Sequence, residues 1–153
     1  MDSKINLKIV LVSNLLILLC SCSNSKHIYT SNCDIDQVFK PVTYANLLDS
    51  LNFYNGRYIE TTGLYIEGKE QSALYSDSEL VKTDADKALW VNFSQDCPLY
   101  LQGTQQGFFE YNNGGFTQIN NKHVRIRGRI DLRNKGHLNQ YRACLDRVSL
   151  IEL

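Results

Sequence analysis

The sequence predicts a mainly β fold: a small five-stranded barrel with a short helix ahead of it. Five stretches of the 153-residue chain are rich in β-branched and aromatic residues and are bounded by turn residues, which is the pattern of short strands. Two of them repeat the same order of turn, strand and glycine, and a glycine inside a strand commonly marks the sharp bend that a closed barrel needs. Residues 22–153 are enough for one domain and not for two of ordinary size, and we expect the domain at residues 41–153.

The first element along the chain is an apolar run that we expect to be removed. Lys4 and Lys8 give it a positive start, and residues 9–19 are apolar except for Ser13 and Asn14. This order is typical of a secretory signal peptide. The run is shorter than the roughly 20 apolar residues that a transmembrane helix needs. A buried helix of a soluble protein is the alternative interpretation.

The end of this run resembles the lipobox of bacterial lipoproteins, in which an aliphatic residue and two small residues precede a cysteine. Residues 19–22 read Leu-Cys-Ser-Cys, and Cys20 in the second position is a departure from the usual pattern. The resemblance implies cleavage before Cys22, lipid on Cys22, and a membrane-anchored lipoprotein of the bacterial cell envelope, on its periplasmic or surface face. We therefore expect a signal peptide at residues 1–21 and a polar, lipidated tether at residues 22–40.

A short helix is expected at residues 43–51, at the start of the domain. Thr43 can cap its first turn, and Pro41 lies just ahead of it. Its apolar residues share one face, as helical spacing requires. These are Tyr44, Leu47, Leu48 and Leu51.

The strands are expected after this helix, separated by polar or glycine-containing turns. Residues 97–121 contain scattered glycines and asparagines and are expected to form an irregular link. A break in the alternation between Leu145 and Val148 predicts a bend or bulge in the last strand. The expected strands are residues 57–67, 72–76, 87–93, 122–130 and 140–153.

The internal repeat carries a more specific resemblance. Residues 55–63 parallel residues 120–128, since each has a turn with asparagine, then a strand, and then Gly63 or Gly128. Two bent strands, five strands in all and an irregular link after the third resemble an OB-fold. The chain is also similar to a group of bacterial envelope proteins with no assigned activity, which share the helix, the turn, the strand ending in glycine and a late Gly-His.

The resemblance to an OB-fold implies a ligand face on the second and third strands and on two loops beside them. In this chain those loops are residues 67–71 and 131–138. Tyr75 and Trp90 on the strands could stack on bases or sugars. The favoured alternative is that one or both of these rings fill the core of the barrel.

Arg125, Arg127 and Arg129 alternate with apolar residues, so they would form a stripe on one side of a strand. Such a stripe could bind phosphate or carboxylate groups. The favoured alternative is a solvated face on which Glu60 and other acidic residues neutralise the arginines.

His137, beside Gly136, could be a metal ligand or a proton-transfer group. A second histidine or a close pair of carboxylates is missing from its sequence neighbourhood, so a role in loop structure is favoured. Neither a cofactor nor a metal is expected. A hydrolase that uses His137 with a nearby acid such as Asp131 is the catalytic alternative.

Charge and cysteine content restrict the partners and the compartment. The chain has 16 basic and 16 acidic residues, which argues against general binding of nucleic acid. The acidic residues concentrate in residues 49–110 and the basic ones in residues 122–147, so the two halves are expected to face each other. Outside the first 22 residues three cysteines remain, enough for one internal disulfide, and Cys33 with Cys97 is the favoured pair, with Cys144 left over.

These observations predict a lipid-anchored cell-envelope protein that acts as a non-catalytic binding or assembly module. The expected ligands are a protein partner, an oligosaccharide and an oligonucleotide, in that order, with nucleic acid disfavoured by charge. The candidate ligand-binding residues are Tyr75, Trp90, Arg125, Arg127, Arg129 and His137. A structural lipoprotein without a small ligand is a further alternative.

Overall fold

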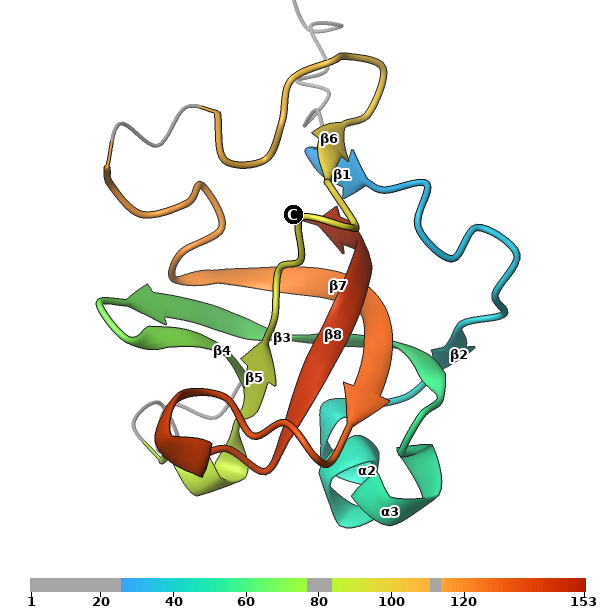
Figure 1. Ribbon diagram of the computed structural model, residues 1–153, viewed down its shortest axis with the longest axis vertical. Coiled ribbons are helices and arrows are strands. Elements are labelled where there is room, and N and C mark those ends of the chain that lie inside the picture. The colour runs from blue at the N-terminus through green and yellow to red at the C-terminus, as the bar shows by residue number, and fades with distance from the viewer. Residues whose placement is uncertain (1–25, 77–83, 111–113) are drawn as a thin grey trace, which may run out of the picture.

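Five strands close into a barrel in the computed structural model, which describes residues 26–76, 84–110 and 114–153 (Figure 1). Two short helices lie against one end of the barrel. The predicted fold class is therefore confirmed. The predicted signal peptide and Cys22 lie outside the described residues. The barrel strands are β3 (Tyr58–Gly68), β4 (Gln71–Tyr75), β5 (Leu89–Val91), β7 (Lys122–Asp131) and β8 (Ala143–Glu152).

The strand order is that of an OB-like Greek-key barrel. β3 pairs antiparallel with β4 on one side and with β7 on the other. β4 pairs antiparallel with β5, and β5 pairs parallel with β8. The antiparallel pairing of β7 with β8 closes the ring. This arrangement is consistent with an OB-fold-like domain.

The two glycines of the internal repeat lie where the backbone of another strand comes close. A Cβ atom at Gly63 would lie 2.5 Å from the carbonyl oxygen of Tyr75, and one at Gly128 would lie 2.7 Å from that of Asp146. Neither distance leaves room for a side chain. Glycine is therefore required at both positions by the closeness of the strands, as bent barrel strands commonly require.

The predicted bulge in the last strand is confirmed. Arg127 pairs with Leu150 and Arg129 pairs with Asp146, so the register between β7 and β8 shifts at this point. Within the shift, Arg147 has a φ of 49°, in the left-handed region that non-glycine residues seldom adopt. The bulge turns the Arg147 side chain toward the N-terminal segment, where it meets Asp34.

Where the sequence predicted one helix, the structure has two short ones, α2 (Tyr44–Asp49) and α3 (Leu51–Tyr54). Ser50 interrupts them with a φ of −126° and a ψ of 30°. The predicted cap at Thr43 is present, because its side chain accepts a hydrogen bond from the backbone N–H of Asn46. The apolar face packs into one end of the barrel core, through Leu47, Leu51 and Tyr54.

The domain begins earlier than the predicted boundary at residue 41. β1 (Ile28–Thr30) lies between β8 and β6 (Tyr100–Leu101) and pairs antiparallel with both. Tyr29 is only 2% exposed. The range 22–40, expected to be a tether, therefore includes residues that belong to the folded domain. The reason is local, since burying Tyr29 removes a large apolar surface from water.

The irregular link between β5 and β7 covers the end of the barrel opposite the helices (Figure 1). Phe108 and Ile119 from this link are buried in the core. Its only strand in the described part is β6, two residues long. A short strand β2 (Lys40–Pro41) pairs parallel with β3. Single 3-10 turns occur at η2 (Ala85–Lys87) and η3 (His137–Asn139).

None of the helices in the described part of the chain has the length and apolar character that crossing a bilayer requires.

Candidate functional site

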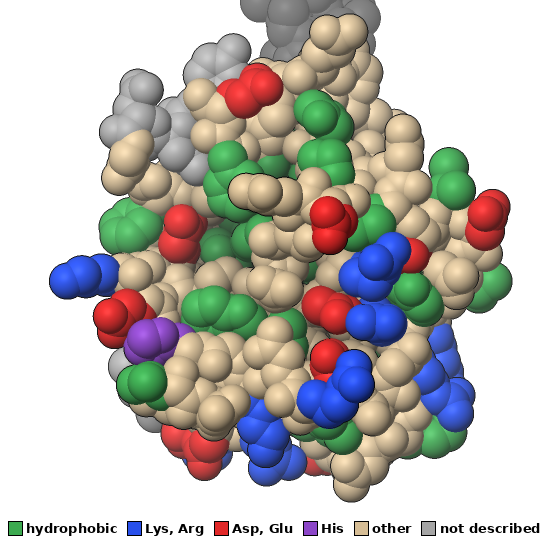
Figure 2. Space-filling view, viewed as in Figure 1, with side chains coloured by type: hydrophobic (Ala, Val, Ile, Leu, Met, Phe, Trp, Pro, Cys, Tyr) green, Lys and Arg blue, Asp and Glu red, His purple; other side chains and the backbone are tan. Residues whose placement is uncertain are grey.

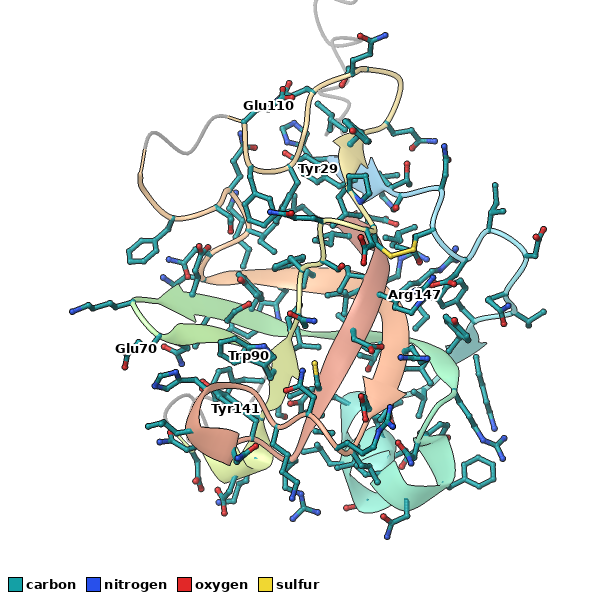
Figure 3. All side chains as sticks on the ribbon, in the orientation of Figure 1. Tyr29, Glu70, Trp90, Glu110, Tyr141 and Arg147 are labelled. Carbon is teal, nitrogen blue, oxygen red and sulfur yellow. A yellow bond between two sulfur atoms is a disulfide. The ribbon has the colours of Figure 1, made fainter. Side chains whose placement is uncertain are left out.

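The structure brings several residues of the predicted ligand face together. Trp90 on β5, Tyr141 just before β8 and Glu70 at the β3–β4 turn lie on the same side of the barrel (Figure 3). His137, on the loop between β7 and β8, has its Nε2 atom 3.3 Å from a carboxylate oxygen of Glu70. The two loops expected beside a ligand therefore touch each other.

This contact places the loop over Trp90. A Cβ atom at Gly136 would lie 2.5 Å from two atoms of the indole ring. The ring of Tyr141 also packs against Trp90, with 5.2 Å between the centroids. A base or a sugar could not enter between Gly136 and the indole without moving the loop. The packing supports a structural role for Trp90, the alternative that the sequence analysis favoured.

Tyr75 belongs to the same small cluster and is 1% exposed. Its hydroxyl accepts a hydrogen bond of 2.8 Å from Nε2 of Gln71. Burial raises the pKa of Tyr75 above the usual value for a phenol, so the side chain stays neutral. A side chain buried to this extent cannot stack on a ligand from solution.

The acidic partner of His137 is Glu70 and not Asp131, the residue considered from the sequence. Asp131 instead accepts a hydrogen bond of 2.8 Å from the backbone N–H of Arg133, which holds its pKa below the usual range. Among the described residues, the side chain of His137 pairs with Glu70 and forms no hydrogen bond with a serine, threonine or cysteine side chain. In the part of the chain that the structure describes, the pair His137–Glu70 is therefore not hydrogen-bonded to a nucleophile.

The arginine stripe is neutralised by carboxylates. Glu60 accepts hydrogen bonds from Nη1 of Arg125 at 3.1 Å and from Nε of Arg127 at 2.6 Å. Arg129 donates to both carboxylate oxygens of Asp146, at 3.1 and 2.8 Å. These contacts support the alternative in which acidic residues on the neighbouring strands neutralise the stripe.

Burial raises the pKa of Glu60, but the hydrogen bonds from Arg127 and Arg125 lower it by more. The net pKa lies below the usual value, so Glu60 is charged at neutral pH. Arg125 also forms an ion pair with Glu152, at the end of β8. A phosphate group at these arginines would have to compete with the carboxylates that already bind them.

A disulfide and an ion pair fasten the N-terminal segment to the barrel. Cys33 and Cys97, the pair favoured from the sequence, are joined with 5.2 Å between their Cα atoms. Next to the bond, Asp34 accepts hydrogen bonds from Nε and Nη2 of Arg147 at 2.7 and 2.8 Å. Those bonds hold the pKa of Asp34 below its usual range.

Cys33, Asp34 and Cys97 form the one group of potential metal ligands in the described part of the chain, with ligand atoms within 4.8 Å of one another. Both sulfurs are used by the disulfide and the carboxylate of Asp34 by Arg147, so the group does not offer free ligands. Cys144 is a buried free thiol, and burial raises its pKa to about 12. A thiol in this state is a poor nucleophile and a poor metal ligand.

A pocket at the end of β5 has several aromatic side chains in its lining, and we call it the aromatic pocket. Its volume is about 590 Å³. The ring of Phe93 lies 5.2 Å from that of Phe108 and 5.6 Å from that of Phe109. The Phe109 side chain is 55% exposed. The pocket is lined by Phe93, Ser94, Gln95, Cys97, Pro98, Leu99, Tyr100, Gly107, Phe108, Phe109 and Glu110.

A second hollow of about 900 Å³ adjoins the aromatic pocket, and we call it the polar groove. The two share Pro98, Tyr100 and Glu110. Figure 2 shows hydrophobic side chains gathered in the upper part of this face, around a depression. The polar groove is lined by Thr30, Ser31, Asn32, Cys33, Asp96, Pro98, Tyr100, Leu101, Gln102, Gly103, Thr104, Gln105 and Glu110.

Comparison with known proteins assigns no family, because no protein-family model, no curated protein and no solved structure matches the chain. The function has to be inferred from the chain's own residues.

The aromatic pocket was not predicted, because most of its residues come from the link that the sequence analysis regarded as irregular. A signal was present there. Phe108 and Phe109 are adjacent, and Gly107 and Glu110 flank them in a stretch otherwise rich in polar residues. Adjacent large aromatic residues in a polar loop are a reason to look for an apolar surface there.

Proposed function

We propose that the chain is a lipid-anchored cell-envelope protein that binds a partner protein, without catalysis, at the aromatic pocket. The observation that carries this proposal is the exposed ring of Phe109, which packs edge-to-face with the rings of Phe93 and Phe108. Exposed aromatic residues beside a preformed apolar pocket are typical of the centre of a binding site.

Binding is favoured over hydrolysis by the surroundings of His137. Its acidic neighbour Glu70 could orient an imidazole, but the contacts of His137 in the described part of the chain include no nucleophile. Proton transfer to a bound water would need a substrate pocket at that place, and there the loop packs against Trp90 instead. The geometry therefore supports the aromatic pocket better than the histidine.

A protein partner is favoured over an oligonucleotide by the state of the arginines. Arg125, Arg127 and Arg129 are all held by carboxylates. Among the described residues, the lining of the aromatic pocket and the polar groove includes no lysine, arginine or histidine. Binding of nucleic acid depends on cations that face phosphates.

The anchor remains a proposal that the lipobox at residues 19–22 supports. β1 begins at Ile28, six residues after Cys22. An extended chain of that length spans about 20 Å. A lipid on Cys22 would therefore hold the domain close to the bilayer surface, with only a short spacer between them.

The proposal can be tested in cells in two independent steps. Labelling with a fatty-acid analogue should mark the protein, and Cys22→Ala should abolish the label. Crosslinking in the membrane should then capture a specific partner with the wild type, and Phe109→Ala should lose that partner. Phe116→Ala is the matched control, because Phe116 is 62% exposed on the same link and does not line the pocket. A label that persists without Cys22 would contradict the anchor, and capture that is unchanged in Phe109→Ala would contradict the site.

A further inference from the structure

We infer that the aromatic pocket and the polar groove together bind a basic peptide segment that carries an aromatic or large aliphatic side chain. This inference rests on the proposed function and names the chemistry of its partner. It has three grounds, which are the rings that line the pocket, the sign of the charges around it and the continuity of the two hollows.

The first ground is the aromatic lining of the pocket. Phe93, Phe108 and Phe109 form a chain of edge-to-face and tilted ring contacts, with centroids 4.8 to 5.6 Å apart. Phe108 is fixed from below by Tyr29 of β1, at 5.0 Å. Rings that are held in place in the free protein lose little entropy when a ligand packs on them, which favours binding of an apolar side chain.

The second ground is charge. Asp96 and Glu110 are exposed and lie on the two hollows, and within the described residues neither carboxylate has an ion-pair partner. This differs from the arginine stripe, where each charge is neutralised. The described residues that line the two hollows include no lysine, arginine or histidine. An unpaired negative rim attracts a basic segment and repels an acidic one.

Aromatic rings at the rim add to the attraction for a cation. Tyr100 is 43% exposed and lines both hollows, together with Glu110. A lysine or arginine over an exposed ring is attracted to the face of the ring, and the nearby carboxylates act in the same direction. Glu110 lies in the link at the top of the molecule, near β6 (Figure 3).

The third ground is the shape of the site, which fits a short peptide rather than one small molecule. The aromatic pocket and the polar groove are continuous through Pro98, Tyr100 and Glu110. Exposed Gln102 and Gln105 in the groove offer amide groups that can pair with a peptide backbone. One large side chain in the pocket and a basic neighbour in the groove would occupy both.

The disulfide makes this site rigid. Cys33 lines the polar groove and Cys97 lines the aromatic pocket, so the bond fixes the walls of the two hollows to each other. Pre-organisation of this kind lowers the cost of binding. An anionic bilayer surface would need the opposite charge at the rim, so it is disfavoured here.

The test uses the full chain in neutral detergent and three fluorescent pentapeptides. The first has a central phenylalanine flanked by lysines, the second has the same phenylalanine flanked by glutamates, and the third has a central serine flanked by lysines. Fluorescence anisotropy, corrected for detergent micelles alone, gives each Kd. Asp96→Asn, Glu110→Gln and Phe109→Ala test the site, and Phe116→Ala is the matched control. A thermal or denaturant unfolding curve for each variant confirms that it folds.

We expect the lysine–phenylalanine peptide to bind about 10-fold more tightly than either of the other two peptides, which corresponds to about 1.4 kcal/mol. Phe109→Ala should weaken its binding by about 10-fold. Asp96→Asn and Glu110→Gln should each weaken it less and reduce its dependence on salt. Phe116→Ala should bind as the wild type does.

Three results would overturn the inference. They are equal or tighter binding of the glutamate peptide, no binding of any peptide at about 1 mM, and binding that Phe109→Ala leaves unchanged. Binding of the wild type to anionic lipid vesicles that Phe109→Ala abolishes would assign the site to a membrane surface instead. Failure of the proposed function would look different, because the fatty-acid label and the captured partner are measured without these peptides.

Discussion

Among single residues, Asp34 and Arg147 show how an ion pair can hold an unfavourable backbone. Both have positive φ values, 59° and 49°, a region that costs energy for residues other than glycine. Their side chains meet across 113 residues of sequence, at 2.7 and 2.8 Å. The side chain of Asp34 is only 9% exposed, so its charge depends on Arg147.

Arg147→Met should lower the free energy of unfolding by about 1–3 kcal/mol, because it leaves the Asp34 carboxylate without its charged donor. Arg133→Met is the matched control. Arg133 also pairs with an aspartate, but its side chain is 87% exposed, so the loss should stay within about 0.5 kcal/mol. Urea denaturation followed through the single tryptophan, Trp90, measures both. Equal losses in the two variants would show that the pair Asp34–Arg147 contributes no more than a surface pair.

The same pair predicts a dependence on pH. The pKa of Asp34 is lower in the folded chain than in the unfolded chain, where it is about 3.9. The stabilisation is therefore present above about pH 4, and it is lost as the pH falls through the folded pKa. Asp34→Asn should be less stable than the wild type at pH 7, and the difference should shrink below about pH 4. A difference that stays constant from neutral to acid pH would contradict this assignment.

Gly136 gives a second prediction for a single residue. Gly136→Ala should destabilise the chain because the new methyl group would meet the ring of Trp90 and because φ is 66°. Gly103→Ala is the control, since Gly103 has a φ of 78° with no atom within 4 Å of the added Cβ. In both variants an alanine must adopt a positive φ, which costs about 1 kcal/mol of stability. Only Gly136→Ala should also shift the tryptophan emission. An unchanged emission spectrum would show that the loop moves away without disturbing Trp90.

The alternating pattern from Val124 to Ile130 correctly indicated that arginines would share a face away from the core. It could not identify all of their partners. Glu60 was foreseen, but Asp146 and Glu152 come from β8, and their positions depend on a register shift that the sequence only hints at. Phe109 was missed for a related reason, since a loop has no periodicity from which to read exposure.

The strands were easier to predict than the side-chain partners, because the local sequence pattern largely determines where a strand begins and ends. β3, β7 and β8 lie close to their expected ranges, and the repeat of Gly63 and Gly128 indicated the bends. β5 is shorter than expected, three residues instead of seven, because the chain leaves the sheet toward the aromatic pocket. β1 was not predicted, since three residues give no recognisable alternation.

Gly128→Ala tests the close approach of β7 and β8. The added Cβ would lie 2.7 Å from a backbone carbonyl oxygen of Asp146, which cannot move without shifting β8, so we expect a loss of about 2 kcal/mol or more. Gly68→Ala is the control, because its Cβ would meet only the flexible side chain of Gln71, at 3.2 Å. Denaturation curves of the two variants give the comparison. A loss for Gly128→Ala as small as that for Gly68→Ala would show that the strands can separate at low cost.

On the scale of the whole molecule, the disulfide links the N-terminal segment to the irregular link across 64 residues of sequence. The double variant Cys33→Ala, Cys97→Ala should lower the free energy of unfolding by about 4 kcal/mol, from the loop entropy that it restores to the unfolded chain. Reducing agent should destabilise the wild type by a similar amount and leave the double variant unchanged. A wild type whose unfolding curve does not respond to the reductant would contradict this role.

The overall architecture could be predicted because it follows from strand number, glycine placement and the position of one irregular link. The sequence did not allow a prediction of how the two ends of the barrel are closed. Phe108 and Ile119 on one end and Leu47 on the other reach the core from segments without strand periodicity. Long-range packing of this kind decides where the aromatic pocket lies. For this reason the candidate site lies on the link and not on the strands where the sequence predicted it.

The position of β1 determines how the molecule responds to a pull on its N-terminal end. Ile28, Tyr29 and Thr30 pair with β8 on one side, and two of them also pair with β6 on the other, so tension along β1 shears hydrogen bonds instead of peeling them one by one. The covalent bond at Cys33 follows directly and transfers the tension to Cys97. The segment from residue 34 to the helices then carries no tension, and the barrel is held from its outer wall, at the mouth of the aromatic pocket.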